Sequence, residues 1–192
     1  MNMDPVLPHK LKTDRLVLRP TSASDAGRAF EIQSNWEVTR MLRRASFPPD
    51  REGLINWFAD HPREWAAAEA YRFGVELRGR LIGIVDIDEI SQREGELGYW
   101  FDQASWGQGY ASEAAKAVVQ FGIYDVGLQC LRAGHAADNR ASGNVLLKLG
   151  FRRCDVVQRM SRSRGEEIIQ RRYILTSPSD IRPPAHSPHI SG

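Results

Sequence analysis

Short runs in which apolar and polar residues alternate fill much of the first half of the chain, and this pattern is typical of β-strands. The predicted strands are residues 15–19, 71–77, 81–87 and 96–101. Arg78-Gly79-Arg80 separates two of these runs and predicts a hairpin turn. Apolar residues recur at helical spacing after Asp25 and after Asp50, and aspartate is a favoured helix N-cap residue. The first half therefore predicts antiparallel strands with two helices among them.

Predicted helices and strands alternate in the second half of the chain. The predicted elements are a loop at 105–109 that opens a helix, a strand at 128–133, a helix at 139–149 and a hairpin of strands at 151–157 and 168–175. Gly150 is a suitable stop for the second helix. The whole pattern predicts one α/β (α+β) domain, in which helices flank a mixed, mostly antiparallel sheet of about seven strands.

The length of 192 residues fits one domain, which we expect at residues 11–175, after an N-terminal extension (1–10). The tail from residue 176 to 192 is rich in proline and serine, which predicts disorder. A net charge of +2 is too small for a concentrated nucleic-acid-binding surface, so no nucleic-acid partner is expected.

The chain has neither an apolar run of roughly 18 residues nor the apolar core of a signal peptide, so we expect a cytoplasmic protein without membrane association. Two cysteines are too few for a disulfide scaffold. Cys130 and Cys154 are therefore expected to be reduced and to lie in the core.

The loop Trp106-Gly107-Gln108-Gly109-Tyr110-Ala111 joins a predicted strand to a predicted helix. Its glycines allow close approach of a ligand to the backbone, and the N–H groups and dipole of the helix N-terminus favour an anion such as a pyrophosphate. Gly-x-Gly alone is more often a plain connection. Ser112 replaces the third glycine of the dinucleotide-binding fingerprint, and the Gly-Lys-Ser/Thr of a Walker loop is missing.

A second segment adds to this loop. Asn139 is a suitable helix N-cap, and Ser142 then lies in the first helical turn, where its hydroxyl can face a cleft. Taken alone, this pair is a cap with a solvated serine.

Together the segments resemble the GNAT acetyltransferase superfamily, and more narrowly its RimJ/RimL-like branch. The residues that carry the resemblance are the loop 106–114, Asn139-x-x-Ser142, Lys148-Leu-Gly-Phe151, the opening Thr13–Pro20 with Asp25, Glu37–Arg40 and Leu81-Ile-Gly83. They occur in the expected order over about residues 11 to 175.

The resemblance implies direct transfer of an acetyl group from acetyl-CoA to an amine, and no metal. It implies that the loop amides hold the pyrophosphate, that the strand at Trp100 and Phe101 pairs with the pantetheine arm, and that Asn139 and Ser142 lie near the sulfur. The implied cofactor-binding residues are Trp100, Phe101, Trp106, Gly107, Gln108, Gly109, Tyr110, Ala111, Asn139 and Ser142.

The candidate catalytic residues are Ser142 and Glu96. Many relatives carry an acid tyrosine where this chain has Leu146, so Ser142 becomes the candidate that protonates the departing thiolate. Glu96 is the first candidate for the base, because its strand leads directly into the cofactor loop. Strand alternation places Glu96 on the same face as Gly98 and Trp100, and a carboxylate beside a glycine leaves room for the amine. His135 is the alternative base, although a structural histidine is commoner.

The acceptor is left open between the N-terminal α-amine of a protein and a small-molecule amine. A non-catalytic acyl-CoA-binding or sensor module is the alternative function, and a homodimer is an open alternative to a monomer. The arginine-rich stretch is expected to be a solvated hairpin face, with contact to an acidic peptide or to RNA as the sharper alternative; it comprises Arg152, Arg153, Arg159, Arg162, Arg164, Arg171 and Arg172.

Overall fold

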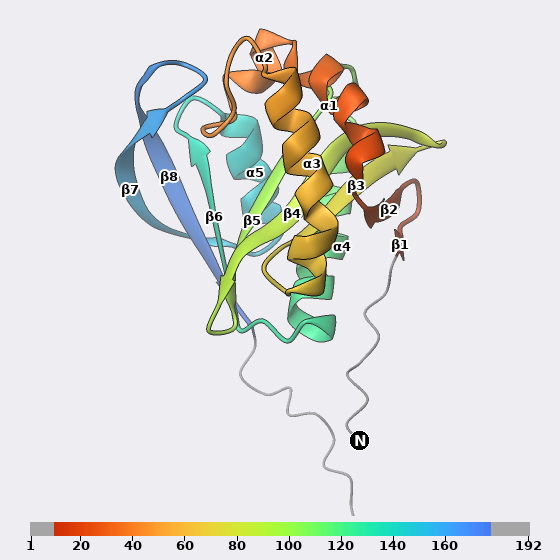
Figure 1. Cartoon of the computed structure of the whole chain (residues 1–192). Helices are drawn as coiled ribbons and strands as arrows, with labels where there is room; N and C mark the ends of the chain where they lie inside the picture. The colour runs from red at the N-terminus through yellow and green to blue at the C-terminus, as the bar shows by residue number, and fades with distance from the viewer. Residues whose placement is uncertain (1–9, 178–192) are drawn as a thin grey trace, which may run out of the picture.

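One sheet of eight strands organises the computed structural model, which describes residues 10–177 (Figure 1). The strands are β1 (Leu11–Lys12), β2 (Val17–Pro20), β3 (Tyr71–Leu77), β4 (Arg80–Ser91), β5 (Glu94–Phe101), β6 (Cys130–Ala136), β7 (Arg152–Ser161) and β8 (Glu166–Thr176). The α-helices are α1 (Ala26–Gln33), α2 (Trp36–Thr39), α3 (Arg51–Ala66), α4 (Tyr110–Gln120) and α5 (Arg140–Lys148). Single turns of 3₁₀-helix are η1 (Ala23–Asp25) and η2 (Gln103–Ser105), and η3 (Phe121–Asp125) is a π-helical turn at the end of α4.

The strands lie in the order β1-β2-β3-β4-β5-β6-β8-β7. Neighbours are antiparallel except for β5 and β6, which are parallel and therefore need a crossover connection, supplied by α4. The predicted mixed, mostly antiparallel sheet is confirmed. It has one strand more than expected, because Leu11 and Lys12 pair with Leu18 and Val17 in a short hairpin.

Helices cover both faces of the sheet and enclose two apolar cores. The larger core lies between the sheet and α4 and α5, and the smaller one between the sheet and α1 and α3. Leu97 and Phe101 of β5 enter the larger core, whereas Trp100 packs against the smaller one. This confirms the predicted alternation, which places Glu96 and Gly98 on the face that α3 covers.

The predicted helix ends are confirmed by their capping contacts. The Asp50 carboxylate accepts a hydrogen bond from the Gly53 amide at the start of α3 (3.0 Å), and the Asn139 side chain accepts one from the Ser142 amide at the start of α5 (3.2 Å). Gly150 follows α5 with a φ of +87°, a conformation that glycine adopts without strain.

Several strand boundaries differ from the prediction, and the residues at the turn between β4 and β5 are not typical turn residues. Gln92 and Arg93 form a tight turn with φ angles of +51° and +64°, so β4 and β5 extend beyond the predicted strands. The closing hairpin is also longer at both strands, and β8 includes Thr176. Placing Cys154 in the core was wrong: it is exposed on the edge strand β7, whereas Cys130 is buried. The predicted extension before residue 10 and the tail after residue 177 lie outside the described residues.

Candidate functional site

The loop between β5 and α4 has the geometry predicted for an anion site. Gly107 and Gly109 have φ angles of +75° and +81°, in the left-handed region where a side chain causes strain. Gly109 is also the N-cap of α4, a helix of 11 residues whose first N–H groups lack intrahelical partners. The helix dipole adds positive potential at this end. A pyrophosphate fits this combination of free N–H groups and potential.

Side-chain hydrogen bonds and an ion pair hold the loop between β5 and α4 in place. The Trp106 indole N–H donates to the Phe101 carbonyl oxygen (3.0 Å), and the Arg15 guanidinium donates to the Gln108 carbonyl oxygen (3.0 Å). Arg15 also pairs with Glu113 in the first turn of α4 (2.6 Å). These contacts use the indole, the carbonyl oxygens and the carboxylate, and so do not occupy the N–H groups of residues 107–111.

Strands β5 and β6 separate beside this loop. In the described part of the chain their pairing ends at Leu97 and Ala133, although β5 continues to Phe101 and β6 to Ala136. Over these last residues each strand stays paired with its outer neighbour, β4 or β8. The edge of β5 that faces the opening can therefore pair with an extended ligand, as it would with an added strand.

The N-terminus of α5 meets β5 beside this opening. The hydroxyl oxygens of Tyr99 and Ser142 lie 2.8 Å apart, and the Tyr99 hydroxyl also donates to the Ser142 carbonyl oxygen (3.0 Å). Burial raises the pKa of Tyr99 to about 12, so its phenol stays protonated at neutral pH. Asn139 fixes the backbone of Ser142 through the capping bond, which leaves the two hydroxyls as a preorganised pair.

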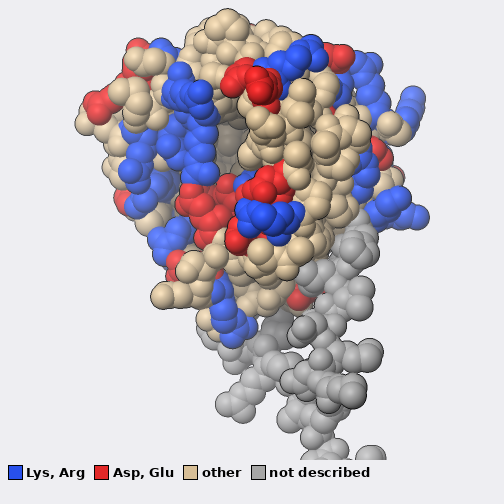
Figure 2. Space-filling model, viewed as in Figure 1, with Lys and Arg blue, Asp and Glu red and all other residues tan. Residues whose placement is uncertain are grey.

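A cleft of about 530 Å³ lies on the other face of the sheet, next to α3 and the loop before it. Gly98 to Trp100 of β5 and Gly134 to Ala136 of β6 line it, so it reaches the opening between these strands. Figure 2 shows this hollow with Lys and Arg side chains along one side and Asp and Glu side chains below it. The cleft thus offers a path to the opening from the face opposite Ser142.

The acidic floor of the cleft is built around one buried arginine. Arg72, whose side chain is 8% exposed, pairs with Asp86 (2.6 Å) and with Glu64 (2.7 Å). A Cβ atom on Gly98 would collide with the Asp86 carboxylate, so any other residue at this position would have to displace that carboxylate. Burial, followed by the charge of Asp88, raises the pKa of Asp86 to about 6, although Arg72 acts in the opposite direction.

The comparison with known families identifies this arrangement. A family model described as an acetyltransferase (GNAT) domain matches residues 15–152, most of the described chain. The chain belongs to the GNAT acetyltransferase family. The resemblance found in the sequence had joined the glycine loop to Asn139 and Ser142, and the structure adds the parallel β5–β6 pair and the opening between its strands.

Curated relatives and solved structures agree with this assignment. The chain is 32% identical over 176 residues to YoaA of Bacillus subtilis (strain 168), which is named as an uncharacterized N-acetyltransferase. This match covers 88% of this chain and 98% of YoaA. Mycobacterium smegmatis RimJ in complex with CoA-disulfide has the same fold, with a TM-score of 0.75 at 21% identity over 84% of this chain and 82% of RimJ. RimL, a ribosomal L7/L12 α-N-protein acetyltransferase in complex with CoA, gives a TM-score of 0.78 at 16% identity over 88% of this chain and 97% of RimL. The protein is therefore an N-acetyltransferase of the GNAT type, and its likeness to RimJ and RimL is confirmed.

The residues predicted to bind the cofactor lie along the opening between β5 and β6. Residues 106–109 form the end of the loop, residues 110–111 begin α4, and Asn139 and Ser142 lie at the N-terminus of α5. Trp100 and Phe101 lie on the open part of β5, but their side chains pack against the two cores. Trp100 also lines the cleft, and the Phe101 carbonyl oxygen already accepts the Trp106 indole N–H.

The two candidate bases have different surroundings. Glu96 lines the cleft, and its carboxylate has no hydrogen bond or ion pair within residues 10–177. His135 is 6% exposed, and its ring nitrogens lie 2.7 Å from the Ala136 carbonyl oxygen and 3.2 Å from the Tyr173 hydroxyl. Burial lowers the pKa of His135. Both of its nitrogens are thus engaged in structural contacts, whereas Glu96 faces open space.

Sequence analysis did not identify Tyr99 or Asp86. Asp86 gave a detectable signal, because it is a charged residue in the otherwise apolar strand 81–87. Tyr99 gave none, because its hydrogen-bond partner Ser142 is 43 positions away in the sequence.

Two negative findings apply to residues 10–177. No helix there combines the length and the hydropathy needed to cross a bilayer. No group of three or more His, Cys, Asp or Glu side chains is arranged there as a metal site.

Gly109→Val should weaken the binding of acetyl-CoA at least about tenfold, or about 1.4 kcal/mol, because a branched side chain strains the left-handed conformation and fills the anion site. Isothermal titration calorimetry measures the dissociation constant. Gly79→Val is the matched control, since Gly79 has a φ of +77° in the remote β3–β4 turn. Equal losses of affinity in the two variants would contradict a local role for Gly109.

Proposed function

We propose that this enzyme transfers the acetyl group of acetyl-CoA directly to a primary amine, without a covalent enzyme intermediate. The observation that carries the proposal is the N-terminus of α4, with Gly107 and Gly109 at positive φ, beside the open edge of β5. The RimJ and RimL structures, which contain CoA, support the same donor.

The donor lies along the opening between β5 and β6. The amides of residues 107–111 hold the pyrophosphate at the N-terminus of α4. Backbone groups of β5 near Trp100 pair with the pantetheine arm, and one N–H of this strand polarises the acetyl carbonyl. Asn139 and Ser142 then face the sulfur end of the donor.

Ser142 protonates the sulfur as the carbon–sulfur bond breaks. Its hydroxyl is a poor acid in water, so its orientation is decisive. Tyr99, 2.8 Å away and protonated at neutral pH, is a positioning residue that orients this hydroxyl. In many relatives a tyrosine at the position of Leu146 protonates the sulfur, and here Ser142, oriented by Tyr99, does so instead. Leu146 itself is buried in the larger core.

The amine approaches from the cleft on the opposite face. An ammonium ion has no lone pair, so its proton must leave before the nitrogen attacks the carbonyl carbon. Glu96 takes this proton, directly or through a water molecule, and its position on β5 just before the opening suits this role. The acceptor is the α-amine of a protein N-terminus or a small-molecule amine. The names of structural neighbours include both a ribosomal-protein acetyltransferase and a microcin C7 self-immunity acetyltransferase.

Thiol release from acetyl-CoA, measured against a mixed panel of N-terminal peptides and small amines, tests the proposed activity. We expect release with at least one acceptor, and mass spectrometry should find the acetyl group on its amine. Acetyl-CoA at a hundredfold excess over its dissociation constant should also stabilise the fold by about 2.7 kcal/mol, and NAD should do much less. Stabilisation by acetyl-CoA without turnover of any amine would instead favour an acyl-CoA-binding module.

Ser142→Ala should lower kcat about a hundredfold or more, because the thiolate would then leave unprotonated. Tyr99→Phe should lower kcat about tenfold through the loss of orientation, with little change in KM. In the double variant the second substitution should have no further effect on kcat, since Tyr99 acts through Ser142. Additive losses, or a near-normal kcat in Ser142→Ala, would exclude this assignment.

The rate should rise with pH to a plateau, because the amine reacts as the free base. Glu96→Gln should remove or shift the lower limb of the profile, and His135→Ala should leave that limb in place. Asp86→Asn is the informative comparison, because the pKa of Asp86 is raised to about 6. A limb near this pH that persists in Glu96→Gln but disappears in Asp86→Asn would transfer the base role to Asp86.

A further inference from the structure

A second pocket, of about 310 Å³, opens beside the cleft and is rich in arginine. Five arginines line it, and they come from three parts of the chain: the loop between α2 and α3, strand β6 and the β7–β8 hairpin. They are Arg43, Arg44, Arg132, Arg159 and Arg172. Glu96 and Arg43 line both this pocket and the cleft of about 530 Å³ through which the amine approaches, so the two spaces are continuous.

Three of the five arginines are already neutralised by carboxylates. Arg44 pairs with Asp88 (3.4 Å) and also with Glu89. Arg132 pairs with Glu94 (2.6 Å), and Arg172 pairs with Asp155 (2.5 Å). The charge of each of these three arginines is thus balanced by at least one carboxylate.

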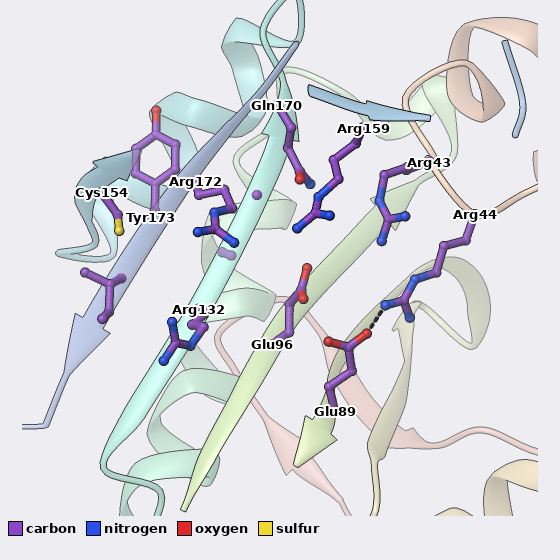
Figure 3. A pocket seen from close by; sticks show the side chains of 13 residues that line it. Arg43, Arg44, Glu89, Glu96, Arg132, Cys154, Arg159, Gln170, Arg172 and Tyr173 are labelled. Atoms are coloured by element: carbon purple, nitrogen blue, oxygen red, sulfur yellow. Dashed lines mark hydrogen bonds and ion pairs between the residues drawn. The ribbon is translucent and has the colours of Figure 1, made fainter. Parts of the chain in front are cut away.

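Arg43 and Arg159 have no ion pair within residues 10–177. Figure 3 shows their guanidinium groups side by side in the pocket, pointing toward the Glu96 carboxylate. Burial lowers the pKa of Arg43, and the neighbouring charges of Arg44 and Arg159 lower it further. Two guanidinium groups therefore share one space with a single unpaired carboxylate, which leaves an excess of positive charge.

Contacts between the β7–β8 hairpin and the loop after α2 keep Arg43 and Arg159 close to each other. The Arg162 amide donates to the Arg43 carbonyl oxygen (2.8 Å), and the Arg164 guanidinium donates to the Arg40 carbonyl oxygen (2.7 Å). Arg164 also pairs with Asp138 at the end of β6 (3.0 Å). The hairpin and the loop after α2 are thus tied to each other, so the closeness of Arg43 and Arg159 is built into the fold.

We infer that the acceptor is a primary amine that carries a carboxylate, with the carboxylate bound between Arg43 and Arg159 and the ammonium beside Glu96. This inference rests on the proposed acetyl transfer and specifies its substrate class. Arginine suits the role, because its planar guanidinium binds a carboxylate with paired hydrogen bonds. Glu89 and Glu96 in the same pocket disfavour an extended polyanion such as RNA.

Two matched pairs of acceptors test the inference. One pair is the peptide amide Ser-Asp-Asp-Ala and its neutral counterpart Ser-Asn-Asn-Ala, and the other is aspartate and its diamide. Each pair changes charge with little change in shape, and the two pairs distinguish a peptide from a small molecule as the source of the carboxylate. In at least one pair, kcat/KM should be about tenfold higher for the charged acceptor.

The double variant Arg43→Gln, Arg159→Gln should abolish this preference by lowering kcat/KM for the charged acceptor about tenfold, mainly through KM, while the neutral acceptor changes little. Arg80→Gln is the control, since Arg80 is exposed at the start of β4 and outside both pockets. The acetyl-CoA-induced rise in melting temperature should be the same in all variants, which shows that the fold and the donor site are intact.

Equal turnover of charged and neutral acceptors, or a preference that survives in the double variant, would overturn the inference and leave the proposed acetyl transfer standing. Thiol release with none of the amines in the wider panel would refute the proposed activity itself, and the inference with it. A higher kcat/KM for both acceptors of a pair in the double variant would also contradict the inference, because it would mean that the arginines repel the ammonium instead of binding the carboxylate.

Discussion

The parallel pairing of β5 with β6 is the constraint on which the rest of the site depends. Parallel neighbours cannot be joined by a tight turn, so the chain must cross over the sheet through a helix. That helix, α4, begins where β5 ends, and its N-terminus comes to lie at the carboxyl end of the parallel pair. Because the pairing ends at Leu97 and Ala133, the strand edge beside this helix end stays open. One topological requirement thus brings together a positive helix end and free strand hydrogen-bonding groups.

The sheet also separates two kinds of chemistry. Tyr99 and Ser142 lie toward α5, where the surroundings are apolar and the phenol is kept protonated. Glu96 and Asp86 face the cleft on the α3 side, where charged groups from β3, β4 and the β7–β8 hairpin gather. In the mechanism proposed above, a proton leaves the amine on one face and another reaches the sulfur on the other. The opening between β5 and β6 is then the place where the two reacting molecules meet.

Much of the fold could be predicted, because its elements carry strong local signals. Alternating apolar residues marked the strands, and Asp50, Asn139 and Gly150 marked helix ends through contacts within a few residues of themselves. The turn at Gln92 and Arg93 was missed because neither residue type favours positive φ. The exposure of Cys154 was missed for another reason: whether an apolar residue on a strand is covered depends on what packs over it, and β7 is an edge strand.

The order of the main elements, the glycine loop at a helix N-terminus and the family could all be predicted from the sequence, because each is marked by short stretches of the chain. Which side chains meet depends on how the chain folds. The Tyr99–Ser142 contact joins residues 43 positions apart, and the Arg43–Arg159 pair depends on a hairpin docked against a loop more than a hundred residues earlier. The same holds for charge: the sequence shows many arginines, but only the folded chain shows that two of the five arginines lining the pocket have no carboxylate partner within residues 10–177. Distance and burial decide such pairings, and neither is a property of local sequence.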